Sequence, residues 1–203
     1  RQPLGDGKDY GGNSTLTYTG VSTPETSPDN PNGIQQGNTV IEGYFRYNLW
    51  EKESIKLPYQ VGSYLGKKKV LGLGVGFFAH PNGMYDPSQG QHSGVFHFAM
   101  DVFLDLPTTS GGLTAYAAFM QFDYGANYLS RWAGTGTVLY GQAGYFIRKA
   151  KLMPYLAYQN GQYEGLEKAT SALDIGINYF IMGHNAKLSL EYHSIRNDPR
   201  ETT

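Results

Sequence analysis

Acidic side chains recur on one face of the strands that the sequence predicts. Asp101 and Asp105, together with His97, alternate with apolar residues in the segment VFHFAMDVFLDL at 95–106. Rings of carboxylates along a passage bias which ions pass. Over all predicted strands this face carries Glu42, Asp101, Asp105, Asp123, Asp174 and Glu191 against Arg46 and Lys187. The pattern predicts a charged lining that selects solutes; the equal alternative is that these groups pair internally and only keep an interior wet.

Other residues could suggest a nucleophile, a phosphate-binding loop or a metal site, but their spacing supports none of these. His92 and Ser93 could be a nucleophile pair, but adjacent residues of an extended segment point apart and no nucleophile elbow is present. The GLGVG run at 72–76 is followed by strand and loop rather than by the helix that a phosphate loop requires. The five His show no metal-ligand spacing, and the chain has no Cys. We therefore expect no enzyme activity, no metal and no cofactor.

Alternation of apolar and mixed residues predicts strands, because a period of two places successive side chains on opposite faces. Predicted strands cover 14–20, 39–50, 70–80, 95–106, 113–124, 137–147, 152–159, 171–181 and 186–193. Pro154 lacks an N–H and weakens the ladder in its strand. The segment 95–106 is longer than an ordinary globular strand of about 5–6 residues. Strands of roughly 9–11 residues are what a tilted strand needs to cross a bilayer.

The connections alternate in length. Short turns are predicted at PTTSGG (107–112), RKAK (148–151) and MGHN (182–185), and long loops at 81–94, 125–136 and 160–170. Outer-membrane barrels have short periplasmic turns and longer extracellular loops, so the PTTSGG turn is expected to face the periplasm. The connection 51–69 breaks the rule, because it is long on the short-turn side. Residues 1–13 are Gly-rich and polar and predict a loop or frayed end.

Composition agrees with a membrane barrel. The 203 residues include 27 Gly and 17 Tyr, and charged residues make up 16%, against about 25% in ordinary globular proteins. Lys plus Arg number 16 against 17 for Asp plus Glu, so the charge favours no nucleic-acid partner. No run approaches the roughly 18 apolar residues of a membrane helix. The mean hydropathy of −0.42 is compatible with a barrel, since only every second residue meets lipid.

The alternation assigns each strand residue to a face. The predicted lipid-facing residues are Phe45, Leu73, Phe77, Phe96, Phe98, Leu104, Tyr116, Phe122, Tyr145, Ile175, Ile177, Leu188 and Leu190. The predicted pore-lining residues are Glu42, Tyr44, Arg46, His97, Asp101, Asp105, Gln121, Asp123, Tyr140, Gln142, Asp174, Asn178, Lys187, Glu191 and His193. Phe98→Arg is expected to block assembly, and Asp101→Asn to alter cation preference without loss of folding.

The stretch 43–192 resembles the porin-type barrels of Bacteroidota that are related to the phosphate-selective porin O and P group. The resemblance is carried by GYFRYNLWEKES, LPYQVGSYLGKKKVLGLGVGFFAHPNGM, DVFLDLPTTSGGLTAYAAF, FDYGANYL, GTGTVLYGQAGY and INYFIMGHNAKLSLEY. It implies a 14–18-strand barrel (roughly), often trimeric, that passes small solutes. About nine strands are predicted here, an odd number, and HSIRNDPRETT lacks the family's closing strand. Residues 1–203 are therefore expected to be the C-terminal part of one longer barrel. The acidic-leaning lining does not match the family's anion selectivity.

The fold class expected is all-β, a transmembrane antiparallel up-and-down β-barrel in the outer membrane of a Gram-negative bacterium. The expected function is a porin through which small hydrophilic solutes diffuse, with outer-membrane lipid, and a homotrimer or other outer-membrane proteins, as partners. One rival is a structural or assembly partner with a plugged lumen that works through its loops, such as 21–38 or 81–94. A second is a soluble barrel or sandwich with its apolar face inward, as in lipocalins. An outer-membrane hydrolase is third, without a Ser/His/acid spacing to support it.

Overall fold

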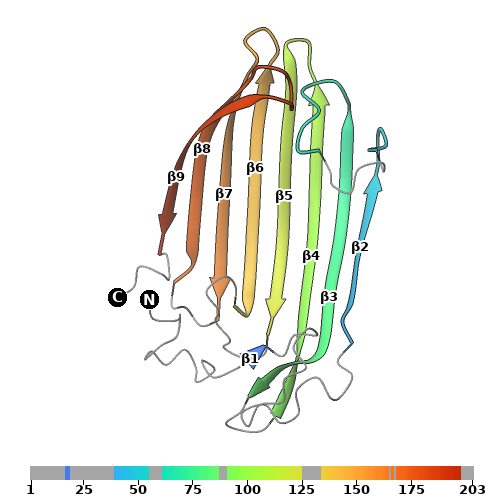
Figure 1. Ribbon diagram of the computed structural model, residues 1–203, viewed down its shortest axis with the longest axis vertical. Coiled ribbons are helices and arrows are strands. Elements are labelled where there is room, and N and C mark those ends of the chain that lie inside the picture. The colour runs from blue at the N-terminus through green and yellow to red at the C-terminus, as the bar shows by residue number, and fades with distance from the viewer. Residues whose placement is uncertain are drawn as a thin grey trace.

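A computed structural model describes residues 17–18, 39–54, 61–86, 91–124, 134–164, 166 and 168–197. These residues form strands, turns and bends, and no helix (Figure 1). The strands are β1 (Thr17–Tyr18), β2 (Ile41–Asn48), β3 (Val70–Asp86), β4 (Gln91–Pro107), β5 (Gly111–Asp123), β6 (Gly136–Ile147), β7 (Leu152–Tyr163), β8 (Thr170–Phe180) and β9 (Lys187–Arg196). The described part of the chain contains no helix long and apolar enough to span a membrane.

All nine strands belong to one antiparallel sheet in the order β1-β3-β4-β5-β6-β7-β8-β9, with β2 also paired to β3. From β3 onward each strand pairs with the next one in sequence, which confirms the predicted all-β, antiparallel, up-and-down arrangement. Among the described residues β2 pairs only with β3, and β9 only with β8, so this sheet is open. Figure 1 shows the two edges on opposite sides, with the short turns at the top.

The longest strands correct one predicted loop. The segment 81–94 was expected to connect two strands, but β3 continues to Asp86 and β4 begins at Gln91. A register shift between His80 and Met84 accommodates the Pro-Asn-Gly sequence there, and pairing resumes beyond it, as at a β-bulge. A turn-like tripeptide therefore bends this strand without ending it. The predicted segments 1–13 and 21–38, and most of 125–136, lie outside the described residues.

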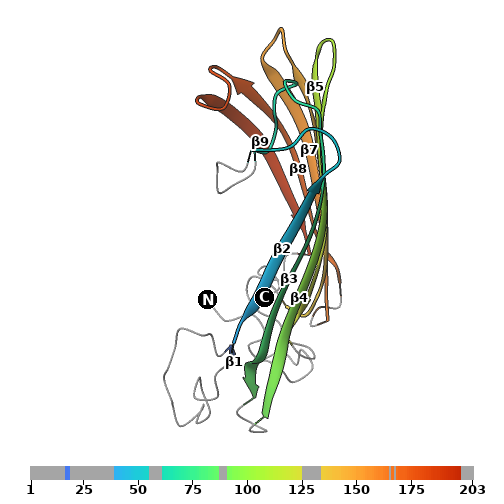
Figure 2. The ribbon, with the colours of Figure 1, turned by 90° about the vertical axis from the view of Figure 1, so that its right-hand side faces the viewer.

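The sheet is curved, so it has a convex and a concave face (Figure 2). Residues paired across antiparallel strands share a face, so Phe77, Phe98 and Leu190 lie on one face. This is the convex face, because Asp105 on the opposite face bonds the chain that lies inside the curve in Figure 2. Large apolar side chains there are exposed, including Leu73, Val75, Phe96, Met100, Leu139, Leu156, Ile175 and Leu190. Among the described strand positions of this face, the charged residues are Asp123 and Arg196, each the last residue of its strand.

Strand β5 is the one strand whose predicted faces are wrong. Tyr116 pairs with Phe103, and Phe122 pairs with His97, so Tyr116 and Phe122 lie on the concave face. Gln121 pairs with Phe98 and Asp123 with Phe96, which places these two polar residues on the convex face. Both faces of this strand carry apolar residues, and the larger ones were assigned outward. Pairing with β4, rather than hydrophobicity, fixes which side they take.

Candidate functional site

Three glycines of β3 clear space on the concave face for side chains from β2. Gly72, Gly74 and Gly76 alternate along β3. A methyl group at Gly72 would overlap the Arg46 guanidinium, and one at Gly74 would overlap both Tyr44 and Asp101. The side chains of Tyr44 and Arg46 therefore lie across β3 toward β4. This is the structural role of the GLGVG sequence, in which a side chain would block the crossing.

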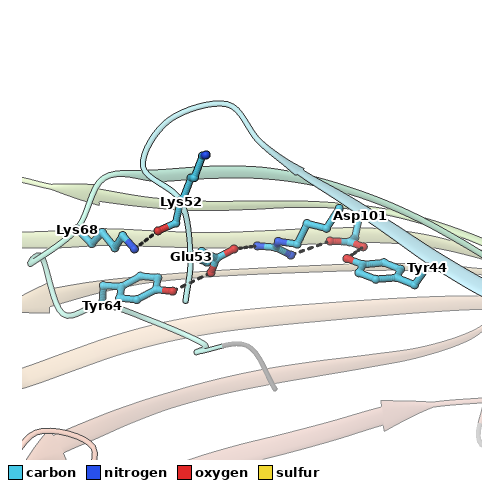
Figure 3. A network of polar contacts seen from close by, with 7 residues as sticks. Tyr44, Lys52, Glu53, Tyr64, Lys68 and Asp101 are labelled. Carbon is cyan, nitrogen blue, oxygen red and sulfur yellow. Dashed lines mark hydrogen bonds and ion pairs between the residues drawn. The ribbon is translucent and has the colours of Figure 1, made fainter. Parts of the chain in front are cut away.

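A charge network centres on Arg46. Its guanidinium lies 2.6 Å from Glu53 and 3.5 Å from Asp101, and 5.5 Å above the ring of Phe103. The Tyr44 hydroxyl donates to Asp101 at 2.9 Å. Side-chain exposure is 11% for Arg46, 7% for Glu53 and 10% for Asp101. These three charged side chains are therefore largely closed to solvent, and the one cation lies between two carboxylates. Figure 3 shows these contacts.

Residues 61–66, here called the inner strap, lie against the concave face at the short-turn end. Asp105 of β4 is fully buried and holds the strap through one carboxylate oxygen. This oxygen accepts hydrogen bonds from the Tyr64 backbone N–H at 2.7 Å, from Thr114 at 2.9 Å and from the Ser63 hydroxyl at 3.1 Å. Its other oxygen has no hydrogen-bond partner among the described residues. The strap therefore supplies two of the three donors to a buried carboxylate.

The strap also contacts each of the three short turns. A side chain at Gly66 would overlap the Gly111 carbonyl oxygen of the β4–β5 turn, so the two backbones touch. Arg148, in the β6–β7 turn, donates to the Gly66 carbonyl at 3.4 Å. His184, in the β8–β9 turn, donates through Nε2 to the Ser63 carbonyl at 2.8 Å. These contacts reach from the turn after β4 to the turn after β8.

An apolar contact and a tight turn complete the docking. Leu65 is buried in a cluster with Phe146, Met153 and Phe180. Leu65 and Gly66 both have left-handed backbone, with φ of 54° and 68°, and the Lys67 N–H donates to the Tyr64 carbonyl across them at 3.1 Å. Positive φ at two successive central residues is the signature of a type I′ turn. A leucine rarely adopts this conformation, so burial of its side chain must offset the strain.

Tyr64 links the strap to the charge network. Its hydroxyl donates to Glu53 at 2.9 Å, and the Lys68 ammonium lies 5.3 Å from the centre of its ring (Figure 3). Burial, together with the hydrogen bond to Glu53 and the negative charge of that carboxylate, raises the pKa of Tyr64 to about 12. The hydroxyl therefore stays protonated and remains a donor over the whole neutral range.

The concave face of β7 to β9 carries a second, more open polar group. Tyr155 reaches Glu191 by crossing Gly176, where a methyl group would overlap its ring. Asp174 contacts His193, and their side chains are 22% and 50% exposed. Ser189 donates to Asn178 at 2.6 Å. In the described part of the chain, residues 61–66 make no hydrogen bond or ion pair with this group, and the His193 side chain is half exposed.

The structure sorts the predicted site residues by face. All predicted pore-lining residues except Gln121 and Asp123 lie on the concave face, and all predicted lipid-facing residues except Tyr116 and Phe122 lie on the convex face. They do not form one site. Arg46 and Asp101 belong to the closed network, Asp105 to the strap, and Asp174, Glu191 and His193 to the open group. His97 is set apart among the rings of Phe78, Phe122 and Tyr124.

The inner strap is the feature that the sequence did not reveal. Ser63, Tyr64 and Leu65 have no period and were assigned to an irregular connection, 51–69. Two signals were present: the unexpected length of that connection on the short-turn side, and Gly112, whose lack of a side chain allows the backbone of Gly66 to approach. Within the described residues, no group of three or more His, Asp or Glu side chains is placed to hold a metal ion.

Comparison with known proteins adds no relative. No protein-family model, no curated protein and no solved structure matches the chain.

Proposed function

We propose that the protein is part of a closed outer-membrane β-barrel and forms a passive diffusion channel for small hydrophilic solutes in a Gram-negative bacterium. The observation that carries this proposal is the contrast between the two faces of one sheet. The convex face exposes large apolar side chains on β2, β3 and β4 and again on β6 to β9, with its charged residues at strand ends. The concave face bears Arg46, Asp101, Asp105, Asp174 and Glu191.

A membrane barrel has its apolar side chains on the outer face and its polar side chains inside, and the two faces of this sheet have the same arrangement. A soluble barrel of the lipocalin type keeps its apolar side chains inside. In lipid, unpaired backbone groups cost several kcal/mol each, so membrane sheets close. The free edges of β2 and β9 are therefore expected to pair with further strands. The resemblance of residues 43–192 to the Bacteroidota porins points to the same function.

Single-channel recording tests the proposal directly. The full-length protein, folded in detergent and added to planar bilayers, should produce discrete current steps, and vesicles that contain it should swell in solutions of small sugars. A protein recovered from cells in aqueous buffer without detergent would contradict the membrane assignment.

A plugged barrel that serves as an assembly partner is the second candidate, and the inner strap is the observation that favours it. The strap lies within the curve of the sheet and contacts all three short turns. Absence of current steps and of swelling, from a protein shown to be folded in the bilayer, would favour this candidate over the channel.

A further inference from the structure

The inner strap crosses the space enclosed by the curved sheet at one level. It precedes β3 in the chain, at one edge of the sheet. Its Ser63 carbonyl nevertheless reaches His184, beyond β8 near the opposite edge. Figure 2 shows the connection between β2 and β3 on the concave side, at the end where the short turns lie. A solute moving along the concave face would meet the strap at this end.

The strap and Asp105 depend on each other. A carboxylate removed from water is costly unless hydrogen bonds satisfy it. Ser63 and Tyr64 supply two of the donors to the buried Asp105, and Thr114 of the neighbouring strand supplies the third. If the strap left, Asp105 would keep only Thr114 and whatever water reached it. The carboxylate therefore favours the docked strap, and its bond from Thr114 also joins β4 to β5.

The local backbone supports a role beyond connecting two strands. Leu65 is held in the left-handed region, and such strain persists only where the surroundings impose it. The glycine contact between strap and β5 leaves no room for a side chain on either backbone. A connection that only linked β2 to β3 would not need these contacts with the turns after β4, β6 and β8.

From this geometry we infer that the inner strap is a constriction of the channel at its short-turn end, and that Asp105 is the positioning residue that keeps it in the passage. This inference rests on the proposed function. The strap limits the size of solutes that pass and the current that a single channel carries. Displacement of the strap widens the passage without opening the wall.

Leu65→Asp tests the constriction, because it places a charge in the cluster of Phe146, Met153 and Phe180 and alters no strand. The variant should carry a severalfold larger single-channel current than the wild type and admit larger sugars in vesicle swelling. Gly62→Asp is the matched control. It adds the same carboxylate to the same strap at an exposed position with open space around it, and should leave the current near the wild-type value.

Two further variants test Asp105 and the docked position. Asp105→Asn keeps the shape of the side chain and should raise the current, whereas Asp123→Asn removes a carboxylate from the convex face, at the last residue of β5, and should not. Ser63→Cys with Thr114→Cys joins two positions whose hydroxyl oxygens are 2.9 Å apart, in a chain with no other cysteine. The oxidised form should carry the wild-type current, and reduction should increase it.

The outcomes separate the inference from the proposed function. Current steps of equal size in wild type, Leu65→Asp and the reduced cysteine pair would overturn the constriction and leave the channel in place. Steps in Leu65→Asp from a silent wild type would support a constriction that closes fully. No steps in any folded variant would overturn the channel, and the constriction with it. Electrophoretic mobility with and without heating verifies that each variant is folded.

Discussion

The Tyr44 hydroxyl reaches Asp101 across an intervening strand, at 2.9 Å, because the residue between them is Gly74. Tyr44 lies on β2, Asp101 on β4 and Gly74 on β3. In the pairing of the sheet, Gly74 stands directly opposite Asp101. The hydrogen bond occupies the space that a side chain at this position would fill. The polar residues of β2 therefore depend on the alternating glycines of β3 to reach β4.

Gly74→Ala should destabilise the sheet. The added methyl group would overlap both Tyr44 and Asp101, and overpacking of this kind costs about 1–3 kcal/mol. Gly141→Ala is the matched control, since nothing lies within 4 Å of its added methyl group. The free energy of unfolding, measured by urea titration in lipid vesicles, should fall for the first variant and stay near the wild-type value for the second. An equal loss in both would show that the crossing does not depend on the glycine.

The sequence was sufficient for most of the sheet because alternation is a strong signal where the two faces differ. In β8, Ile175 and Ile177 alternate with the polar residues Asp174 and Asn178, so the sequence alone shows which residues lie on the apolar face. In β5 the signal fails, since Tyr116 and Phe122 on one face compete with Leu113 and Phe119 on the other. Only the register with β4 decides between them. A strand with apolar residues on both faces needs its neighbour to orient it.

The inner strap could not be predicted for a different reason. Ser63, Leu65 and Gly66 are brought to Asp105, Phe180 and Gly112 by the folding of the whole sheet, over sequence distances that no local pattern spans. The length of the connection 51–69 and the glycine at 112 marked this region as unusual, but neither indicates which residues meet. Asp105 lies on the concave face, and two of its three donors are on the strap.

Removal of charge at two concave positions should have different effects on ion selectivity. Asp101 is nearly buried, 3.5 Å from Arg46 and hydrogen-bonded by Tyr44, so Asp101→Asn should change the cation preference little, contrary to the expectation from alternation alone. Asp174 is more exposed, and Glu191 lies on the exposed edge strand. Asp174→Asn with Glu191→Gln should lower the cation preference. Reversal potentials in a salt gradient measure both, and a larger shift for Asp101→Asn would contradict the assignment.

Docking of the strap should weaken in alkaline solution. The ordinary pKa of tyrosine is 10.0. The pKa of Tyr64 is raised to about 12, because burial and the neighbouring Glu53 favour the neutral form of its hydroxyl. A raised pKa gives a stabilisation that is complete below about pH 10 and is lost as the pH rises toward about 12. A fluorescent label on Gly62→Cys should report a change over this interval. The same label on a Tyr64→Phe background should lack that step, and an identical step there would exclude Tyr64 as its source.

Arginine scanning along the convex face should locate the lipid. Met100 is exposed in the middle of β4. Phe98 is the next residue of β4 on the convex face, nearer to the start of that strand, and pairs with Gln121. Asp123 lies on the same face as the last residue of β5. An Arg near the bilayer midplane costs roughly 2–4 kcal/mol, and one near the interface about 0–1. The folded fraction after refolding into vesicles should therefore fall most for Met100→Arg, less for Phe98→Arg and least for Asp123→Arg. If Met100→Arg refolded as well as Asp123→Arg, the convex face would not be in contact with lipid, since a position in water carries no such penalty.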